Sequence, residues 1–97
     1  LLTLTKNTAN SLRRNRIRVN AVAPGWMATE GEADIQRRYH GGGDDWAEKA
    51  AAQSPMGQLV EPDELAPLIA YLLSPSSGLI TGAIIDYDQQ IIGAVPE

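Results

Sequence analysis

The sequence of 97 residues contains no cysteine. It therefore cannot form disulfide bonds or hold a metal ion through thiolate ligands. No apolar run approaches the roughly 20 residues that are needed to cross a lipid bilayer. No basic segment followed by an apolar one opens the chain, as it would in a secretory signal peptide. These absences favour a cytoplasmic protein that has no part in a membrane.

Acidic residues are absent from the first 19 positions, which hold five basic residues, although the whole chain has a net charge of −4. A basic cluster can indicate nucleic-acid binding. Here no aromatic residue interleaves with the arginines, and arginines at the end of a helix interact favourably with its dipole. We therefore expect no nucleic-acid partner.

What is present is the patterning of a globular domain, with 43% hydrophobic and 21% charged residues. Apolar residues at helical spacing predict a helix over 1–14, with Asn15 as its left-handed C-cap. Residues 17–23 predict a strand with apolar residues on one face and Val22 on the other, and little of it past Arg18 is strongly polar, as in a strand that is covered on both sides. Pro24-Gly25 ends this strand.

The second half predicts a helix over 62–73, with Pro62 in its first turn and Pro67 tolerated near its start, and a strand over 83–87. A helix between two strands implies parallel pairing and an α/β sheet. Two parallel strands alone cannot form a covered sheet. The chain also starts within a helical pattern and without methionine. We therefore expect a fragment whose neighbours come from an N-terminal part or from another copy.

Residues 26–56 form a long, less regular stretch, which is typical of a functional lid or of disorder. Within it we expect a short helix over 46–53, with Asp44 or Asp45 as its N-cap. The glycine triplet at 41–43 follows no predicted strand and does not fit a dinucleotide loop. His40 with these two acids is a weak metal candidate, because such a polar loop is far more often solvated. We predict no metal site.

Ligands of open α/β sheets bind beyond the carboxyl ends of the strands, and residues 24–29 lie just past such an end. Gly25 allows a flat ligand to approach the backbone closely. The Thr29 hydroxyl can both donate and accept a hydrogen bond, which suits a carboxamide. Pro-Gly alone would indicate only a turn, so the surrounding residues decide the interpretation.

The segment Asn20-Ala-Val-Ala-Pro24-Gly25, followed by Thr29, resembles the strand-and-turn segment of the short-chain dehydrogenase/reductase family. The resemblance continues, in the family's order and spacing, through residues 1–9, 55–57, 61–66 and 71–74, and through 80–82 with Asp86. It implies the C-terminal part of a Rossmann-like, doubly wound parallel sheet in the order helix, strand, lid, helix, strand. Residues 1–97 would be a fragment of one such domain, and residues 30–56 its substrate lid.

The resemblance also implies roles for single residues toward NAD or NADP. Pro24 and Gly25 would pass along one face of the nicotinamide ring. Met27, through its backbone amide and carbonyl, and Thr29, through its hydroxyl, would hold the carboxamide. Asn20 would be mainly structural. Trp26 and Trp46 would either line the substrate pocket or serve packing.

The family's catalytic tyrosine and lysine stand in a Tyr-x-x-x-Lys spacing, and this chain lacks that pair. The residues four positions after its three tyrosines are Gly43, Pro75 and Ile91, and Leu2 stands four positions before Lys6. We therefore predict no catalytic residue here and expect the pair upstream of Leu1. The chain also has Gln89-Gln90 where many members have two glycines, which puts the usual tight turn in doubt.

The resemblance implies an oxidoreductase that transfers hydride between nicotinamide and an alcohol or ketone, in a homo-oligomer that is a tetramer in the family. This chain would supply the nicotinamide edge, the lid and an oligomer face, and it would be inactive alone. The alternative is a non-catalytic, truncated chain that folds only by association with itself or with a partner.

Overall fold

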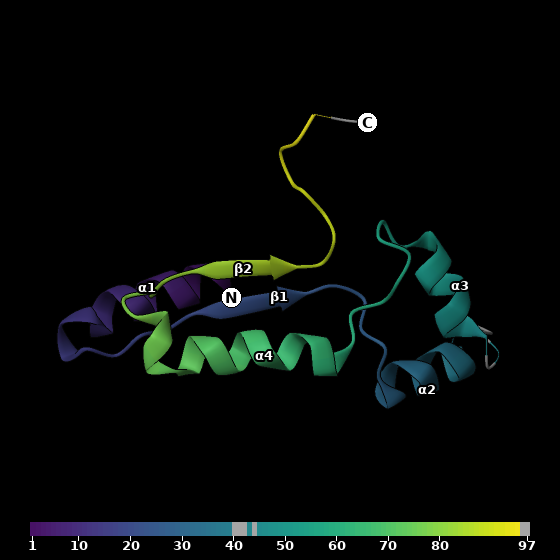
Figure 1. Ribbon diagram of the computed structural model, residues 1–97, viewed down its shortest axis with the longest axis horizontal. Helices are drawn as coiled ribbons and strands as arrows, with labels where there is room; N and C mark the ends of the chain where they lie inside the picture. The colour runs from purple at the N-terminus through teal and green to yellow at the C-terminus, as the bar shows by residue number, and fades with distance from the viewer. Residues whose placement is uncertain (40–42, 44, 96–97) are drawn as a thin grey trace.

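The computed structural model describes residues 1–39, 43 and 45–95. Its helices and strands follow the predicted order, with one additional helix in the lid (Figure 1). The elements are α1 (Leu2–Leu12), the 3-10 turn η1 (Arg13–Asn15), β1 (Ala21–Pro24), α2 (Glu30–Tyr39), α3 (Trp46–Gln53), α4 (Pro62–Leu73), the 3-10 turn η2 (Pro75–Ser77) and β2 (Ile84–Tyr87).

The two strands pair in parallel, with Ala21 opposite Ile84 and Pro24 opposite Tyr87. The predicted α/β architecture is therefore confirmed. β1 is shorter than the predicted strand over 17–23, because the residues before Ala21 bond to the loop before β2 instead of a strand ladder. The Val19 amide donates to the Thr81 hydroxyl (3.2 Å), and the Val19 carbonyl accepts from the Gly82 amide (2.8 Å).

The helices α1 and α4 lie on different sides of the strands (Figure 1). α1 buries Thr5 and Ala9, and α4 buries Leu65 and Leu72. The core is nevertheless thin, and the radius of gyration is 16.7 Å, compared with roughly 13 Å for a compact domain of this length. The sheet is thus only partly enclosed by the residues that the structure describes.

The end of α1 differs from the prediction. Asn15 lies within the 3-10 turn η1, and the left-handed residue is Arg16, with a φ of 60°. The Arg16 amide closes this turn on the Arg13 carbonyl (3.1 Å). The prediction of Asn15 as the left-handed cap is therefore wrong by one residue, because the helix tightens into a 3-10 turn before it ends. α4 runs through Pro67, as predicted.

Residues 30–56, which were predicted to form a lid, contain the two helices α2 and α3, of which only α3 was predicted. Asp45 stands at the N-cap position of α3 without a side-chain cap bond, and its carboxylate pairs with Lys49 instead (3.2 Å). Trp46 and Ala50 of α3 form a small core with Leu59, which follows the predicted lid in the chain. His40, Gly41, Gly42 and Asp44 lie outside the described residues, and so does the weak metal candidate.

The unpredicted helix α2 is stabilised by polar interactions at its ends. The Thr29 hydroxyl accepts a hydrogen bond from the Glu32 amide (3.1 Å) and so caps the first turn. Acidic residues lie in the first turn and basic residues in the last, as the helix dipole favours.

In the described parts of the chain, no helix is long and apolar enough to cross a membrane. No group of three acidic or histidine residues there is placed to hold a metal ion.

Candidate functional site at the carboxyl ends of the strands

The predicted site residues lie where both strands end. The last link between the strands is a hydrogen bond from the Gly25 amide to the Tyr87 carbonyl (3.0 Å). A cavity of about 410 Å³ opens beside it. Its walls come from the turn after β1, the end of α3 with the residues after it, and the turn after β2. The lining residues are Pro24, Gly25, Trp26, Ala50, Gln53, Ser54, Pro55, Asp88, Gln89 and Gln90.

Gly25 is required by the close approach of the turn after β2. A Cβ atom on this residue would lie 2.9 Å from the Asp88 Cα atom and 3.0 Å from the Asp88 Cβ atom. Both distances are shorter than normal carbon–carbon contacts. The glycine therefore allows the two strand ends to pack against each other, which adds a structural reason to the expected ligand contact.

The Met27 amide has no backbone partner among the described residues, whereas the Met27 carbonyl accepts from the Thr29 amide (3.1 Å). Met27 forms an isolated parallel bridge with Val60. The hydrogen bonds of this bridge use the flanking residues, because the Ala28 amide donates to the Val60 carbonyl (3.0 Å) and the Val60 amide donates to the Trp26 carbonyl (2.9 Å). Within the described residues, nothing accepts a hydrogen bond from the Met27 amide. A donor is thus left at the strand-end turn.

Thr29 lies at the boundary between this turn and the lid. Its amide donates to the Met27 carbonyl (3.1 Å), and its hydroxyl oxygen caps α2. A hydroxyl that accepts one hydrogen bond still has a proton to donate. The Thr29 side chain can therefore begin the lid helix and bind a ligand at the same time.

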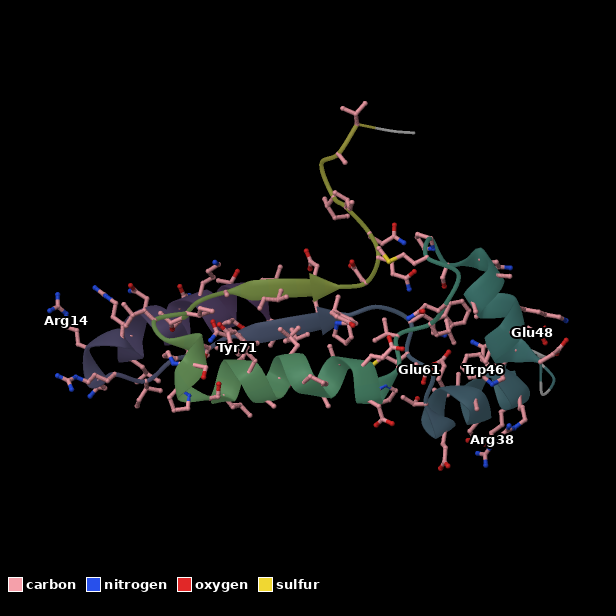
Figure 2. The ribbon with its side chains drawn as sticks, in the orientation of Figure 1. Arg14, Arg38, Trp46, Glu48, Glu61 and Tyr71 are labelled. Atoms are coloured by element: carbon pink, nitrogen blue, oxygen red, sulfur yellow. The ribbon has the colours of Figure 1, made fainter. Side chains whose placement is uncertain are left out.

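The two tryptophans differ in position: Trp26 lines the cavity, and Trp46 is packed in a small core. Trp26 lines the cavity and is 43% exposed, and its indole nitrogen donates to the Glu32 carboxylate (3.1 Å). Trp46 is 9% exposed and belongs to this small core, where Figure 2 shows it between α2 and α3. The rings lie 6.3 Å apart. Trp26 is therefore the aromatic wall of the cavity, and Trp46 supports it from the lid.

Asn20 has a structural role, as the resemblance implied, but it acts at the beginning of β1 and not at the turn. Its side-chain amide donates to the Ile80 carbonyl (3.0 Å), and its side-chain oxygen accepts from the Ala83 amide (3.0 Å). Arg18 reinforces this contact by donating to the carbonyls of Ile80 (3.2 Å) and Ser74 (3.0 Å). Together they set the register of the strands.

Gln89 is a site residue that the sequence analysis did not assign. Its side-chain oxygen accepts from the Met56 amide (2.7 Å), and its side-chain nitrogen donates to the Gln58 carbonyl (2.7 Å). Its φ of 65° is a conformation that glycine would adopt more easily. The departure from the family's glycine pair was the available signal, and the turn still forms with a glutamine in it.

Among the described residues, no hydrogen bond joins a tyrosine to a lysine. Tyr71 lies on α4 at the end away from the lid (Figure 2), and its hydroxyl donates to the Ser76 carbonyl (3.4 Å). Tyr87 ends β2 and lines a second cavity of about 370 Å³. Lys49 is paired with Asp45. That this chain contributes no catalytic residue stays a prediction.

Known proteins resemble the chain over most of its length. A family model described as enoyl-(acyl carrier protein) reductase matches residues 1–89. The mouse (3R)-3-hydroxyacyl-CoA dehydrogenase is 34% identical over 83 residues, which are 86% of this chain and 29% of that enzyme. The chain therefore spans about a third of the length of such relatives.

Solved structures show the same fold. A short-chain dehydrogenase family protein from Francisella tularensis superposes with a TM-score of 0.78 at 30% identity, over 91% of this chain and 38% of that one. A variant of actinorhodin polyketide ketoreductase, solved with NADPH, superposes with a TM-score of 0.76 at 30% identity, over 91% of this chain and 35% of that one. With a family match over 89 residues and these structural neighbours, the chain belongs to the short-chain dehydrogenase/reductase family.

Proposed function

We propose that the protein to which these residues belong is an NAD(P)-dependent oxidoreductase that transfers hydride between nicotinamide and an alcohol or ketone. In this proposal the chain supplies the nicotinamide edge, the lid over residues 30–56 and a face for homo-oligomer assembly. The observation that carries it is the Met27 amide beyond the end of β1, which the bridge to Val60 leaves without an acceptor among the described residues. The location is proposed to be cytoplasmic.

The described residues fit one edge of a nicotinamide cofactor. The Met27 amide is a free donor within the described residues, and the Thr29 hydroxyl has a proton left to donate after it caps α2. A carboxamide requires both a donor and an acceptor; the acceptor in this proposal is the second lone pair of the Met27 carbonyl, which also accepts from the Thr29 amide (3.1 Å). Pro24 and Gly25 would lie against the ring face. When bound, the cofactor supplies or accepts the hydride, and the related ketoreductase was solved with NADPH.

The lid would exclude water from the substrate and help to select it. Trp26 and the polar residues Gln53 and Ser54 line the cavity on this side. A small alcohol or ketone can contact the indole and bond to the polar groups. The general acid/base tyrosine and its lysine would come from a part of the protein outside these residues.

Two Met27 variants of the whole protein test the proposed cofactor edge. Met27→Ala keeps the backbone donor, whereas Met27→Pro removes it, and the bridge to Val60 does not use that amide. We expect Met27→Pro to weaken NADH or NADPH binding about tenfold, the effect of one good hydrogen bond, and Met27→Ala to leave it nearly unchanged. Cofactor fluorescence titration measures both, and thermal melting checks that the proline variant is folded. Equal binding by two folded variants would contradict the cofactor edge.

Activity is tested on the whole protein without substitutions. The two assays are ketone-dependent oxidation of the reduced cofactor and alcohol-dependent reduction of the oxidised cofactor. We expect saturable binding of one nicotinamide cofactor and turnover with at least one small alcohol or ketone. The proposed function is wrong if the whole protein binds neither NAD(H) nor NADP(H).

The second candidate is a non-catalytic chain that folds by self-association or with a partner. It is favoured by large apolar side chains that the described fold leaves open, including Leu73 (80% exposed), Leu79 (96%) and Ile92 (90%). Sedimentation and circular dichroism of the isolated 97 residues test it. A folded oligomer, such as the tetramer that the family forms, supports association through this chain. A well-folded monomer contradicts it.

A further inference from the structure

We propose that Gln89 is a positioning residue that holds the returning arm of the lid, residues 54–58, against the carboxyl end of β2 and thereby sets substrate affinity. This inference rests on the proposed function, because it assumes that the cavity beside Gly25 receives the substrate. Gln89 would not contact the reacting atoms. It would act through the backbone of the returning arm.

The contact consists of two short hydrogen bonds from one side chain. The Gln89 oxygen accepts from the Met56 amide, and the nitrogen donates to the Gln58 carbonyl, both at 2.7 Å. An amide side chain has a donor and an acceptor on the same planar group, so it can bind an extended segment at two points. The returning arm, which receives these two hydrogen bonds, contains a turn in which the Gly57 amide donates to the Ser54 carbonyl (2.9 Å).

The backbone of Gln89 supports a specific role for this side chain. Its φ of 65° lies in the left-handed region, which costs free energy for a residue other than glycine unless neighbouring contacts compensate. Glycine would form this turn without strain, but it would offer no side chain to the returning arm. The two hydrogen bonds are the compensation that the structure provides.

The position of Gln89 connects this contact to the candidate substrate site. It lines both the cavity beside Gly25 and the second cavity, which Met56 and Gln58 also line. The returning arm then continues to Val60, which is bonded to the turn after β1. Within the described residues, the backbone of Val60 thus attaches the chain just after the arm to the turn after β1, whereas the Gln89 attachment of the arm itself depends on a side chain.

Gln90 is a matched control for this role. It is the neighbouring glutamine, it is exposed, and it lines the same two cavities. Its backbone amide donates to the Asp88 carboxylate (3.0 Å), but its side chain makes no hydrogen bond within the described residues. Truncating Gln90 therefore changes the cavity surface by the same atoms without releasing the returning arm.

The test compares Gln89→Gly, Gln89→Ala and Gln90→Ala in the whole protein. Both Gln89 variants lose the two side-chain hydrogen bonds. Alanine remains strained at a φ of 65°, whereas glycine adopts this φ without strain. We expect both to raise the substrate KM and to speed hydrogen exchange at the Met56 amide, each by about tenfold, with kcat and cofactor affinity changed less than about twofold. Because Gln90 also lines the cavity, its control reading is hydrogen exchange at the Met56 amide, which we expect Gln90→Ala to leave at the rate of the unmodified protein.

Melting temperatures separate positioning from a general structural role. We expect Gln89→Ala to melt lower than Gln89→Gly, because glycine adopts the left-handed conformation freely, while the two share the same rise in KM. A KM that follows the melting temperature instead would overturn the proposal, as would unchanged Met56 exchange in both variants. If the unmodified protein has no oxidoreductase activity, the proposed function fails, whereas the exchange measurement still decides whether Gln89 holds the arm.

Discussion

Substituting Gly25 by alanine is a direct test of how the two strand ends pack. The added Cβ atom would lie 2.9 Å from the Asp88 Cα atom and 3.3 Å from the Asp88 carbonyl oxygen. These are backbone atoms, so no side-chain rotation can relieve the contact. The φ of Gly25 is not positive, so alanine adds a collision without backbone strain of its own.

The expected cost follows from the displacement that is needed. Ordinary carbon–carbon contact begins near 3.5 Å, so the turn after β2 must shift by about half an ångström. Overpacking of this kind typically costs about 1–3 kcal/mol. The shift would also strain the hydrogen bond between the Gly25 amide and the Tyr87 carbonyl (3.0 Å). We therefore expect Gly25→Ala to lower the free energy of unfolding by this amount and to weaken cofactor binding.

Gly31→Ala is the matched control, because the same methyl group is added to another glycine of the site region. A Cβ atom on Gly31 would meet only the Thr29 hydroxyl oxygen, at 4.0 Å. Gly31 lies in the first turn of α2, where alanine is favoured over glycine by up to about 1 kcal/mol. Urea unfolding of the whole protein measures both variants. The packing argument is refuted if Gly25→Ala is as stable as Gly31→Ala.

Substitutions at three further positions test the cap of α2, the register contact of Asn20 and the small core around Trp46. Thr29→Val removes the cap of α2, so it should destabilise this helix by about 1 kcal/mol and weaken cofactor binding. Thr29→Ser keeps the hydroxyl, so it should leave both the stability and the cofactor affinity nearly unchanged. Thermal melting and cofactor titration measure these two properties. Asn20→Ala leaves the Ile80 carbonyl and the Ala83 amide without their partner, so urea unfolding should show a loss of about 1–3 kcal/mol; an unchanged midpoint would contradict the register role. Trp46→Ala empties this small core, so exchange should rise throughout the lid while the strands stay protected.

The parts of the fold that the sequence predicted correctly are those with strong local signals. The helix α4 was predicted over the range that the structure shows, because Pro62 marks its first turn and an apolar stripe continues to Leu73. The helix α3 follows Asp45 and ends at Ser54-Pro55, again as predicted. Parallel pairing followed from a helix between two strands.

The helix α2 was missed because its signal is not apolar periodicity. Its sequence is mostly polar, and Ile35, the largest apolar residue of its central turns, is 42% exposed. The helix is stabilised by the Thr29 cap, by charges that match its dipole, and by an ion pair between Arg38 and Asp34 (3.2 Å). Thr29 with Glu32 three positions later was the available signal.

The candidate site was located from the sequence, but its contacts were not, because its partners lie far away along the chain. Pro24 to Thr29 could be placed beyond a strand end from local pattern alone. The atoms that restrict Gly25 belong to Asp88, and the bridge that orients Met27 comes from Val60. No periodicity specifies such approaches, since they depend on how the two strand ends and the lid pack together.

Gln89 shows how a departure from a family pattern becomes interpretable only with geometry. From the sequence, a glutamine in place of glycine predicts a disturbed turn, because the sequence does not show which atoms the glutamine side chain contacts. The structure keeps the left-handed turn and joins the side chain to a segment 31 to 33 residues earlier in the chain. The same substitution that strains the backbone therefore provides the bonds that offset the strain. Local propensity alone accounts for the first effect, and the second requires the returning arm of the lid to be in place.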